Sequence, residues 1–395
     1  MITHYDICIQ GSGIVARTLA LLLAKERFRV ALVSEMSTPK PESAGDDKHD
    51  VRAYALNAAS KNLLESLRVW PDAAHATPVL GMQVHGDTTG RVNFSAAERG
   101  SEALAWIVDV PALEAQLLQA VRYQPLITSI EQVASTHLQD VNSKIRRDLT
   151  VICEGKNSVT RDELGVDFDV TPYHQHAIAA RLTGTLPHNK QALQWFKNGE
   201  ILAFLPLSEA NQAYPGNSVA LVWSVAEERA KALMALTGEA FAAEVSAYSG
   251  HALGEMVLYS ERADWPLQLA RADRWVGKSA ELGSWALAGD AAHTVHPLSG
   301  QGLNLGLADV AELADVLGAI RGKEYWRSVA DLKLLRRYER ARKLDALALG
   351  TVTDGLQQLF ARSESPLQAL RNWGMQGFER SGGLKQWVTK RAMGL

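Results

Sequence analysis

The chain has 395 residues, of which 47% are hydrophobic and 22% are charged, and its formal net charge is −3. This length favours two domains or one large two-lobed unit. The balanced charge argues against nucleic acid as the main partner. Because no apolar run is long enough to span a membrane and no signal peptide begins the chain, we expect a cytoplasmic protein.

The chain opens with a β–α–β pattern. An apolar strand at 4–10 is followed by the sequence GSGIVA, a helical apolar run and a second strand, FRVALVSE. In a G-x-G-x-x-A loop, the first glycine allows the tight turn and the second lets a pyrophosphate approach the backbone. Alanine then permits close helix–strand packing, and the helix N-terminus offers free N–H groups to the phosphates. We therefore expect cofactor contacts from Gly11, Gly13, Ile14, Val15 and Ala16.

The end of the second strand leaves two interpretations open. The acid that binds ribose in such folds is expected at residue 34, which is Ser34 here, and Glu35 follows one position later. Glu35 either reaches the ribose through a small shift or is a solvated loop acid.

The periodicity of apolar residues changes in the middle of the chain. Residues 52–69 have helical periodicity, whereas 166–285 contain strand-like runs such as EILAFLPL and SVALVWSV. Cys8 and Cys153 lie in apolar runs and are expected to be buried thiols rather than a disulfide. These patterns predict an α/β fold, with a Rossmann-like dinucleotide-binding domain, an inserted mainly antiparallel sheet and a helical C-terminus. The expected domains are 1–75 with 100–165 and 280–335 for the dinucleotide, 76–99 with 166–279 for the substrate sheet, and 336–395 for the helical region.

The stretch GDAAHTVHPLSGQGLNLGLADV, residues 289–310, could hold a metal, a nucleophile or a cofactor. His293 and His296 lack the helical i, i+4 spacing of a zinc protease, and Pro297 follows them directly, so we expect no metal and structural roles for both histidines. The absence of G-x-S-x-G also argues against a hydrolase.

The remaining interpretation of the stretch 289–310 is a second cofactor loop. Gly289 and Asp290 end a buried strand, so the carboxylate can accept from ribose or ribityl hydroxyls. Gly300-Gln301-Gly302 opens a helix whose positive N-terminal end would stabilise negative charge on a flavin. Two helix N-termini could hold one long dinucleotide, which favours FAD over NAD.

These stretches resemble the FAD-dependent hydroxylases of ubiquinone biosynthesis, a branch of the class A flavoprotein aromatic monooxygenases. The resemblance runs nearly end to end. It includes GSGIVA, the block DVRAYALNAASKNLLESLRVW, the motif CEGKNSVTR, the stretch 289–310, the segment YERARKLDALALGTVTDGLQQLF and the ending KRAMGL.

The resemblance implies FAD, transient NAD(P)H and O2, and hydroxylation of the ring of a polyprenylated phenol through a flavin hydroperoxide. It places Arg52 near the flavin and Asp290 on the ribityl hydroxyls. Pro297 would line the flavin face where oxygen reacts, and the amides near Leu303 and Asn304 would face the pyrimidine edge. No general acid or base is assigned.

Three departures from the family pattern keep alternatives open. They are the displaced ribose acid, Glu154 in place of aspartate, and Val110-Pro111 where the branch usually has Asn-Arg. A catalytically weakened accessory subunit of a quinone-biosynthesis complex, or another FAD-dependent oxidoreductase on this scaffold, is the alternative interpretation.

A basic C-terminal segment, 366–395, interleaves cations with aromatic residues. Such a segment can rest on an anionic surface at the inner face of a membrane, or it can form a helix packed on the protein. The sequence does not decide between these two interpretations, nor whether other quinone-biosynthesis proteins bind.

Overall fold

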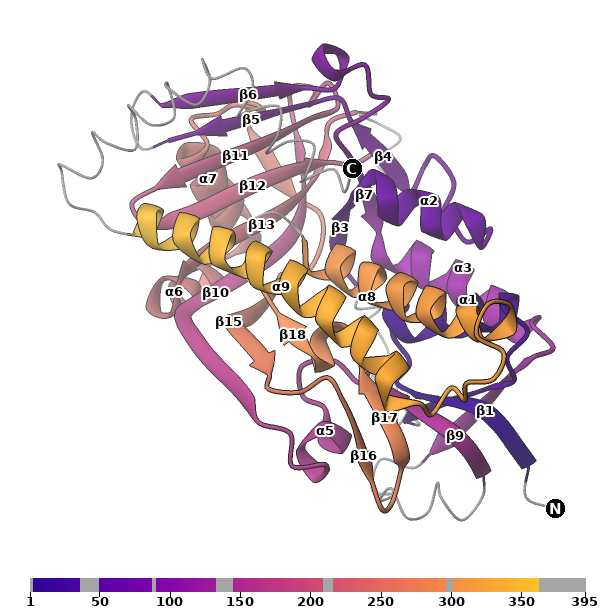
Figure 1. Cartoon of the computed structure of the whole chain (residues 1–395). Coiled ribbons are helices and arrows are strands. Elements are labelled where there is room, and N and C mark those ends of the chain that lie inside the picture. The colour runs from indigo at the N-terminus through magenta and orange to yellow at the C-terminus, as the bar shows by residue number, and fades with distance from the viewer. Residues whose placement is uncertain are drawn as a thin grey trace.

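The computed structural model describes residues 3–35, 50–86, 90–132, 145–208, 216–295 and 301–361. Its strands form three sheets, with helices between and around them (Figure 1). A six-stranded sheet has the order β16-β17-β9-β1-β2-β8, and a nine-stranded sheet lies beside it. A three-stranded sheet, β3-β7-β4, lies close to both.

The six-stranded sheet is mainly parallel and builds the expected β–α–β unit. The strand β1 (Thr3–Gln10) pairs in parallel with β2 (Val30–Glu35) and β9 (Ile145–Ile152), and α1 (Ile14–Lys25) connects β1 to β2. Cys8 and Cys153 are buried free thiols, and burial raises the pKa of Cys8 to about 12, so it behaves as a small apolar side chain. The remaining strands are β8 (Ile127–Gln132), β16 (Val276–Ser279) and β17 (Gly283–Leu287).

The nine-stranded sheet is antiparallel except where β11 pairs with β5. One face packs on α6 (Glu227–Ala235) and α7 (Gly238–Tyr248) through Ile178, Leu202 and Trp223. Its strands are β5 (Gly81–His85), β6 (Arg91–Ser95), β10 (Phe168–Gly184), β11 (Gln191–Lys197), β12 (Glu200–Pro206), β13 (Ser218–Ala226), β14 (Met256–Leu258), β15 (Ala263–Ala272) and β18 (His293–Thr294).

The opposite face of this sheet carries small side chains. Ala179 pairs with Ala263 on one side and with Val222 on the other, and Val222 pairs with Ala203. Directly paired residues lie on the same face of a sheet. These four residues, the alanine row, therefore cross β15, β10, β13 and β12 on the face turned away from α6 and α7.

The predicted helix at 52–69 is wrong in its first part. Residues Ala53–Leu56 form β3, which pairs with β7 (Ala105–Asp109), and β7 also pairs with β4 (Ala76–Val79). Helix α2 (Ala58–Ser66) begins only after Asn57, whose side chain accepts a hydrogen bond from the Ser60 N–H. The apolar spacing was misleading because Leu56 is buried in the observed strand, as it would also be in a helix.

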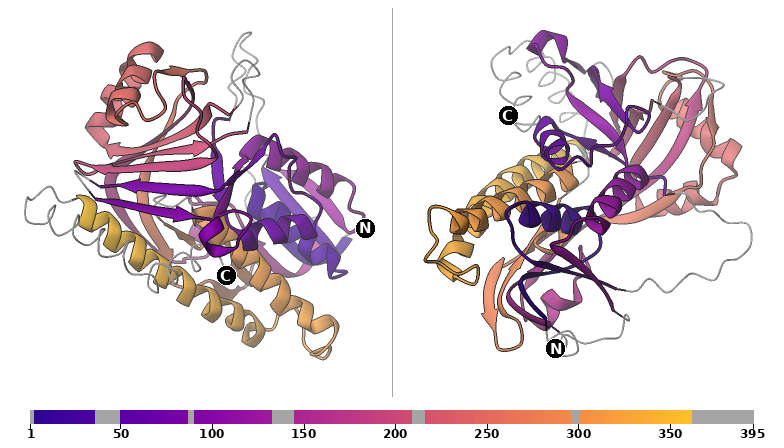
Figure 2. Two further views of the ribbon diagram at one scale, coloured as in Figure 1. Left: turned by 90° about the horizontal axis from the view of Figure 1, so that it is seen from above. Right: turned by 90° about the vertical axis from the view of Figure 1, so that its right-hand side faces the viewer.

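The helices α8 (Gln301–Gly318) and α9 (Leu332–Ala361) pack on each other, with α8 also against α1 (Figures 1 and 2). Two further helices are α3 (Val110–Arg122) and α5 (Val159–Glu163). The α/β fold class is confirmed, while the domain boundaries stay a prediction. Within the described ranges, no helix has the length and apolar character needed to cross a membrane.

Candidate functional site

The first glycine of the N-terminal loop is required by the fold. Gly11 has φ +131°, and a Cβ atom there would lie 2.3 Å from the carbonyl oxygen of Cys153. The Cys153 N–H in turn donates to the carbonyl of Gln10 at 2.7 Å. The chain after β9 therefore presses on the turn, and only glycine fits at position 11.

The second glycine has space around it. Gly13 is the exposed N-cap of α1, no side chain caps the helix, and nothing lies within 4 Å of a Cβ built there. Ile14 and Ala16, one and three residues on, are buried against the core. The buried Oε1 of Gln10, at the end of β1, has no partner in the described part of the chain. The open helix N-terminus fits an anionic group, whereas the unpaired acceptor fits a hydrogen-bond donor of a polar ligand.

The two predicted cofactor loops meet at Val15. A Cβ on Gly306, in α8, would lie 2.9 Å from Cγ2 of Val15, and one on Gly289 would lie 3.2 Å from Cγ1 of Val15. Glycine at 289, where φ is +64°, and at 306 lets α1, α8 and the turn after β17 approach closely. The N-terminal parts of two helices, far apart in sequence, are thereby brought together.

Asp290 follows Gly289 in a short 3-10 turn, η2 (Gly289–Ala291), and its side chain is exposed. Protein atoms nevertheless surround it densely, and this burial raises the pKa of its carboxyl, while His293 and Lys156 act in the opposite direction. A carboxylate that is surrounded by protein atoms but still reaches solvent is well placed to accept hydrogen bonds from the hydroxyls of a bound molecule.

A buried carboxylate fixes this turn from behind. Asp309 of α8 accepts hydrogen bonds from the Gly289 N–H at 3.1 Å, from Nε2 of His293 at 2.6 Å and from Nε of Arg342 at 2.8 Å. Burial opposes ionisation of Asp309, but His293 and Arg342 together lower its pKa below the usual value. His293 also stacks on Trp275, with ring centroids 4.9 Å apart. His293 is thus a supporting residue, whereas His296 lies outside the described residues.

Arg52 lies among charged groups close to β3. Its Nε donates to both carboxylate oxygens of Asp50 at 2.9 Å. Burial opposes ionisation of Asp50, but the hydrogen bonds from Arg52 lower its pKa. Arg17 lies in the first turns of α1, and both Arg17 and Arg52 interact electrostatically with Glu114 of α3. Cations therefore lie near the open helix terminus.

Tyr54 joins Arg52 to the second loop. Burial raises the pKa of its hydroxyl, and the group interacts electrostatically with Arg52 and with Asp290. The predicted residues Arg52 and Asp290 therefore both act on Tyr54.

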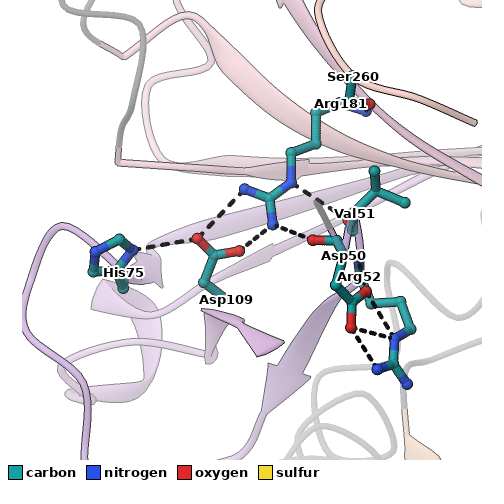
Figure 3. A network of polar contacts seen from close by, with 7 residues as sticks. All are labelled: Asp50, Val51, Arg52, His75, Asp109, Arg181 and Ser260. Carbon is teal, nitrogen blue, oxygen red and sulfur yellow. Dashed lines mark hydrogen bonds and ion pairs between the residues drawn. The ribbon is translucent and has the colours of Figure 1, made fainter. Parts of the chain in front are cut away.

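Arg181 of β10 connects the nine-stranded sheet to the segment just before Arg52 (Figure 3). Its guanidinium pairs with the carboxylate of Asp109, at the end of β7, which also contacts Nδ1 of His75 at 3.3 Å. Its Nε and Nη2 donate to the carbonyls of Val51 and Asp50, each at 3.4 Å. One half-buried guanidinium thus holds the backbone just before Arg52.

The start of α8 contains the remaining predicted residues. Gln301, Gly302 and Leu303 are half-buried, and nothing lies within 4 Å of a Cβ built on Gly302. The Asn304 side chain turns toward α2, accepting from the Asn57 N–H at 3.0 Å and from Ser60 Oγ at 2.7 Å. Its side chain is therefore structural, and the role of the amides near Leu303 and Asn304 stays a prediction.

Some predicted residues cannot be placed in full. Pro297 and Gly300 lie outside the described residues. Ser34 is half-buried at the end of β2, and Glu35 is the last residue of that strand. The ribose contact of Ser34 or Glu35 stays a prediction.

Two departures from the family pattern have a structural explanation. Glu154 accepts from Ser158 Oγ at 2.7 Å and from the Thr160 N–H at 3.1 Å, so the longer carboxylate caps α5. Val110 and Pro111 begin α3, where proline is favourable because its missing N–H needs no partner in the first turn.

Comparison with known proteins decides which ligand this geometry serves. Residues 4–351 match the family described as FAD binding domain. The chain is 32% identical to 3-demethoxyubiquinol 3-hydroxylase of Escherichia coli strain K12, with 99% of this chain and 98% of the relative covered. The chain belongs to the family of FAD-dependent ubiquinone hydroxylases.

A second relative and a solved structure are also similar to this chain. Ubiquinone hydroxylase UbiL of Rhodospirillum rubrum is 29% identical, with 98% of this chain and 89% of the relative covered. The crystal structure of p-nitrophenol 4-monooxygenase PnpA from Pseudomonas putida DLL-E4 has the same fold, with a TM-score of 0.72 at 15% identity, covering 100% of this chain and 99% of that chain. Family membership confirms the predicted cofactor, FAD, and the predicted class, an FAD-dependent monooxygenase.

Several residues of the site were not predicted from the sequence. Gly306 lies one helical turn after Gly302, and Asp309 interrupts an apolar helical face; a charge at such a position signals a buried, paired group. Tyr54 lies in the strand that was expected to be helical. Arg181 and Gln10 gave no local signal, because Arg181 acts through contacts distant in sequence and the unpaired oxygen of Gln10 follows from its burial in the fold.

The two glycines of the first loop are expected to respond differently to alanine. Gly11→Ala should lower the unfolding free energy of the apoprotein by at least about 1–3 kcal/mol, since it adds positive-φ strain to a clash with Cys153. Gly13→Ala should change apoprotein stability by less than about 1 kcal/mol yet weaken FAD binding at least ~10-fold. Thermal unfolding and flavin titration separate the two, and equal destabilisation by both variants would contradict this assignment.

Asp309→Asn should destabilise the protein by about 3–5 kcal/mol, because it leaves Arg342 buried without a full counter-charge. Asp315→Asn, at an exposed position of the same helix, is the control and should change stability by less than about 0.5 kcal/mol. Since the pKa of Asp309 is lowered in the fold, its contribution is complete above pH ~4 and is lost as the pH falls below that value. Urea unfolding across pH tests both points.

Arg181→Lys should lower FAD affinity and activity more than Arg262→Lys. A lysine cannot contact Asp109 and two backbone carbonyls together. Arg262 is a matched control because it donates to the carbonyls of Leu233 and Leu236, next to the helices that cover the other face of the sheet. Flavin titration and steady-state rates give the comparison, and equal losses in both variants would remove the special role of Arg181.

Proposed function

We propose that this protein hydroxylates the aromatic ring of a polyprenylated phenol intermediate of ubiquinone biosynthesis, using FAD, NAD(P)H and O2. The single observation that carries the proposal is the similarity to 3-demethoxyubiquinol 3-hydroxylase of Escherichia coli, which is 32% identical over 99% of this chain. It is supported by the meeting of the two loops at Val15, with Asp290 and Arg52 nearby.

The residues present suit FAD. The open N-terminus of α1 and the free space at Gly13 would receive the pyrophosphate, with Arg17 and Arg52 adding positive charge. The carboxylate of Asp290 would accept from ribityl hydroxyls, and the first turn of α8 would face the pyrimidine edge of the flavin. When bound, FAD supplies the redox chemistry, taking electrons from NAD(P)H and activating O2.

The nine-stranded sheet would form the wall of the site against which the substrate binds. Its alanine row is on the face that also bears Arg181, since Arg181 pairs with Ala220, which in turn pairs with Leu205. Leu205 and Ala220 share a cluster with Ala53 and Ala55 of β3, the strand next to Arg52. Small side chains leave room for an apolar ring and chain between the sheet and the flavin site, and apolar walls exclude water from the reaction.

The substrate class brings the protein to a membrane surface. A polyprenyl chain partitions into lipid because each buried methylene contributes about 0.8 kcal/mol. We therefore also propose peripheral contact with the inner face of the membrane, to which the basic segment 366–395 contributes.

The expected result is a yellow protein that oxidises NAD(P)H faster when a prenylated phenol is present. Oxygen from isotopically labelled O2 should appear on the product ring, as mass spectrometry would record. FAD binding without any oxygenated product would instead favour the accessory-subunit alternative.

Asp290→Ala should weaken FAD binding. Loss of hydrogen bonds to a charged acceptor costs about 1.5–3 kcal/mol, which is roughly 10- to 150-fold in Kd. Asp315→Ala, an exposed acid on α8, is the control and should bind FAD as the wild type does. Unchanged FAD affinity in Asp290→Ala would refute its assignment to the cofactor.

A further inference from the structure

An exposed aromatic pair lies in the turn between α8 and α9. The side chains of Tyr325 and Trp326 are 78% and 67% exposed, and their rings contact each other edge to face with centroids 5.4 Å apart. Large apolar side chains that are exposed next to each other on a surface usually mark an interaction site. Tyr and Trp are the residues preferred at a membrane–water interface, because each joins an apolar ring to a polar group.

The outer side of α9 continues this surface. Lys333, Arg336, Arg340, Leu344 and Leu347 follow one another at intervals of three or four residues, so they form one stripe along the helix. Leu344 and Leu347 are 70% and 51% exposed, while Leu334, Leu335 and Tyr338 on the opposite side are buried. The helix crosses the front of the molecule in Figure 1 and lies along one edge of it in the left view of Figure 2. We call the stripe, with Tyr325 and Trp326, the α9 face.

The charge of this region opposes that of the whole chain. Residues 321–347 contain nine Lys and Arg residues against four Asp and Glu residues, a net charge of +5, whereas the whole chain carries −3. Arg337 pairs with Glu324 at 2.5 Å, and Arg342 is buried on Asp309. Lys333, Arg336 and Arg340 are exposed and make no ion pair within the described ranges. A positive surface therefore remains for an external anion.

We propose that the α9 face docks the protein on an anionic phospholipid surface, with Tyr325 and Trp326 in the headgroup region and the cations of α9 on the lipid phosphates. This inference rests on the proposed function, because a polyprenylated substrate must be taken from lipid. Cations near an anionic membrane attract it, and exposed aromatic and leucine side chains add apolar contact.

The chain's own C-terminal segment is a poorer occupant of this face. Residues 362–395 contain six Lys and Arg residues against two Glu residues. Two basic segments repel each other, but an anionic surface attracts both. A second copy of the protein would also have to bring this positive face against its own equivalent, because a twofold interface uses the same patch on both subunits.

The test uses the FAD-loaded full chain and sedimentation with vesicles. Phosphatidylcholine vesicles containing phosphatidylglycerol should bind the protein, and pure phosphatidylcholine vesicles should bind it much more weakly. The variants Tyr325→Ser/Trp326→Ser and Lys333→Gln/Arg336→Gln/Arg340→Gln should each bind the anionic vesicles at least ~10-fold more weakly.

Matched controls come from exposed residues elsewhere. Tyr123→Ser removes an aromatic side chain that is 74% exposed, and Arg122→Gln/Arg146→Gln/Lys278→Gln removes the same charge from other surfaces. Both should bind vesicles as the wild type does. Equal loss in control and α9-face variants would reduce the effect to net charge or general stickiness and overturn the proposal.

Three other outcomes would also overturn it. One is undiminished vesicle binding by both α9-face variants, with loss only when residues 366–395 are removed. Another is equal binding to charged and neutral vesicles. The third is a dimer in solution that the Tyr325→Ser/Trp326→Ser variant dissociates. FAD content and NAD(P)H oxidation with a water-soluble phenol should be unchanged in the variants, so failure of docking is distinct from failure of the proposed function.

Discussion

The close approach of α1, α8 and the turn after β17 is the constraint on which the site depends. Val15 fills the space that side chains at Gly289 and Gly306 would otherwise occupy. Separating the helices by even a methyl group would move one positive helix end away from the other. A ligand as long as FAD gains from both ends only if their spacing is fixed, so packing in the core sets the electrostatics at the surface.

The buried Asp309 shows how a costly group can be retained at such a site. Its carboxylate is fully desolvated, which is unfavourable unless every lone pair is used. Here the partners are a backbone N–H of the turn, a histidine and an arginine from α9. Each partner comes from a different segment, so one side chain defines how the Gly289-Asp290 turn, α8 and α9 fit together. The charge thereby fixes the geometry of the turn, and its removal is costly because Arg342 would lose a buried partner.

The sequence allowed the α/β class, the two glycine-containing loops that follow buried strands and the supporting role of His293 to be predicted, because glycine spacing and apolar periodicity are local signals. It could not reveal the ion pair of Arg181 with Asp109, since a salt bridge between residues distant in sequence leaves no periodic pattern. The cap that Glu154 forms on α5 was missed although its partners are close in sequence, because that helix is too short to show a period. The helix predicted over residues 53–56 was wrong for a related reason. Their apolar spacing suits a helix, and only pairing with β7 makes them a strand.

Helix α9 connects the interior of the protein to its outer surface. Arg342 reaches inward from α9 to Asp309, whereas Arg336 and Arg340 of the same helix point to solvent. A helix that anchors the Gly289-Asp290 turn on one side therefore presents cations and leucines on the other. If the outer side rests on lipid, the membrane and the Gly289-Asp290 turn are held by one rigid element. Such an element fixes the orientation of the flavin site relative to the surface that carries its substrate, and no moving part is required.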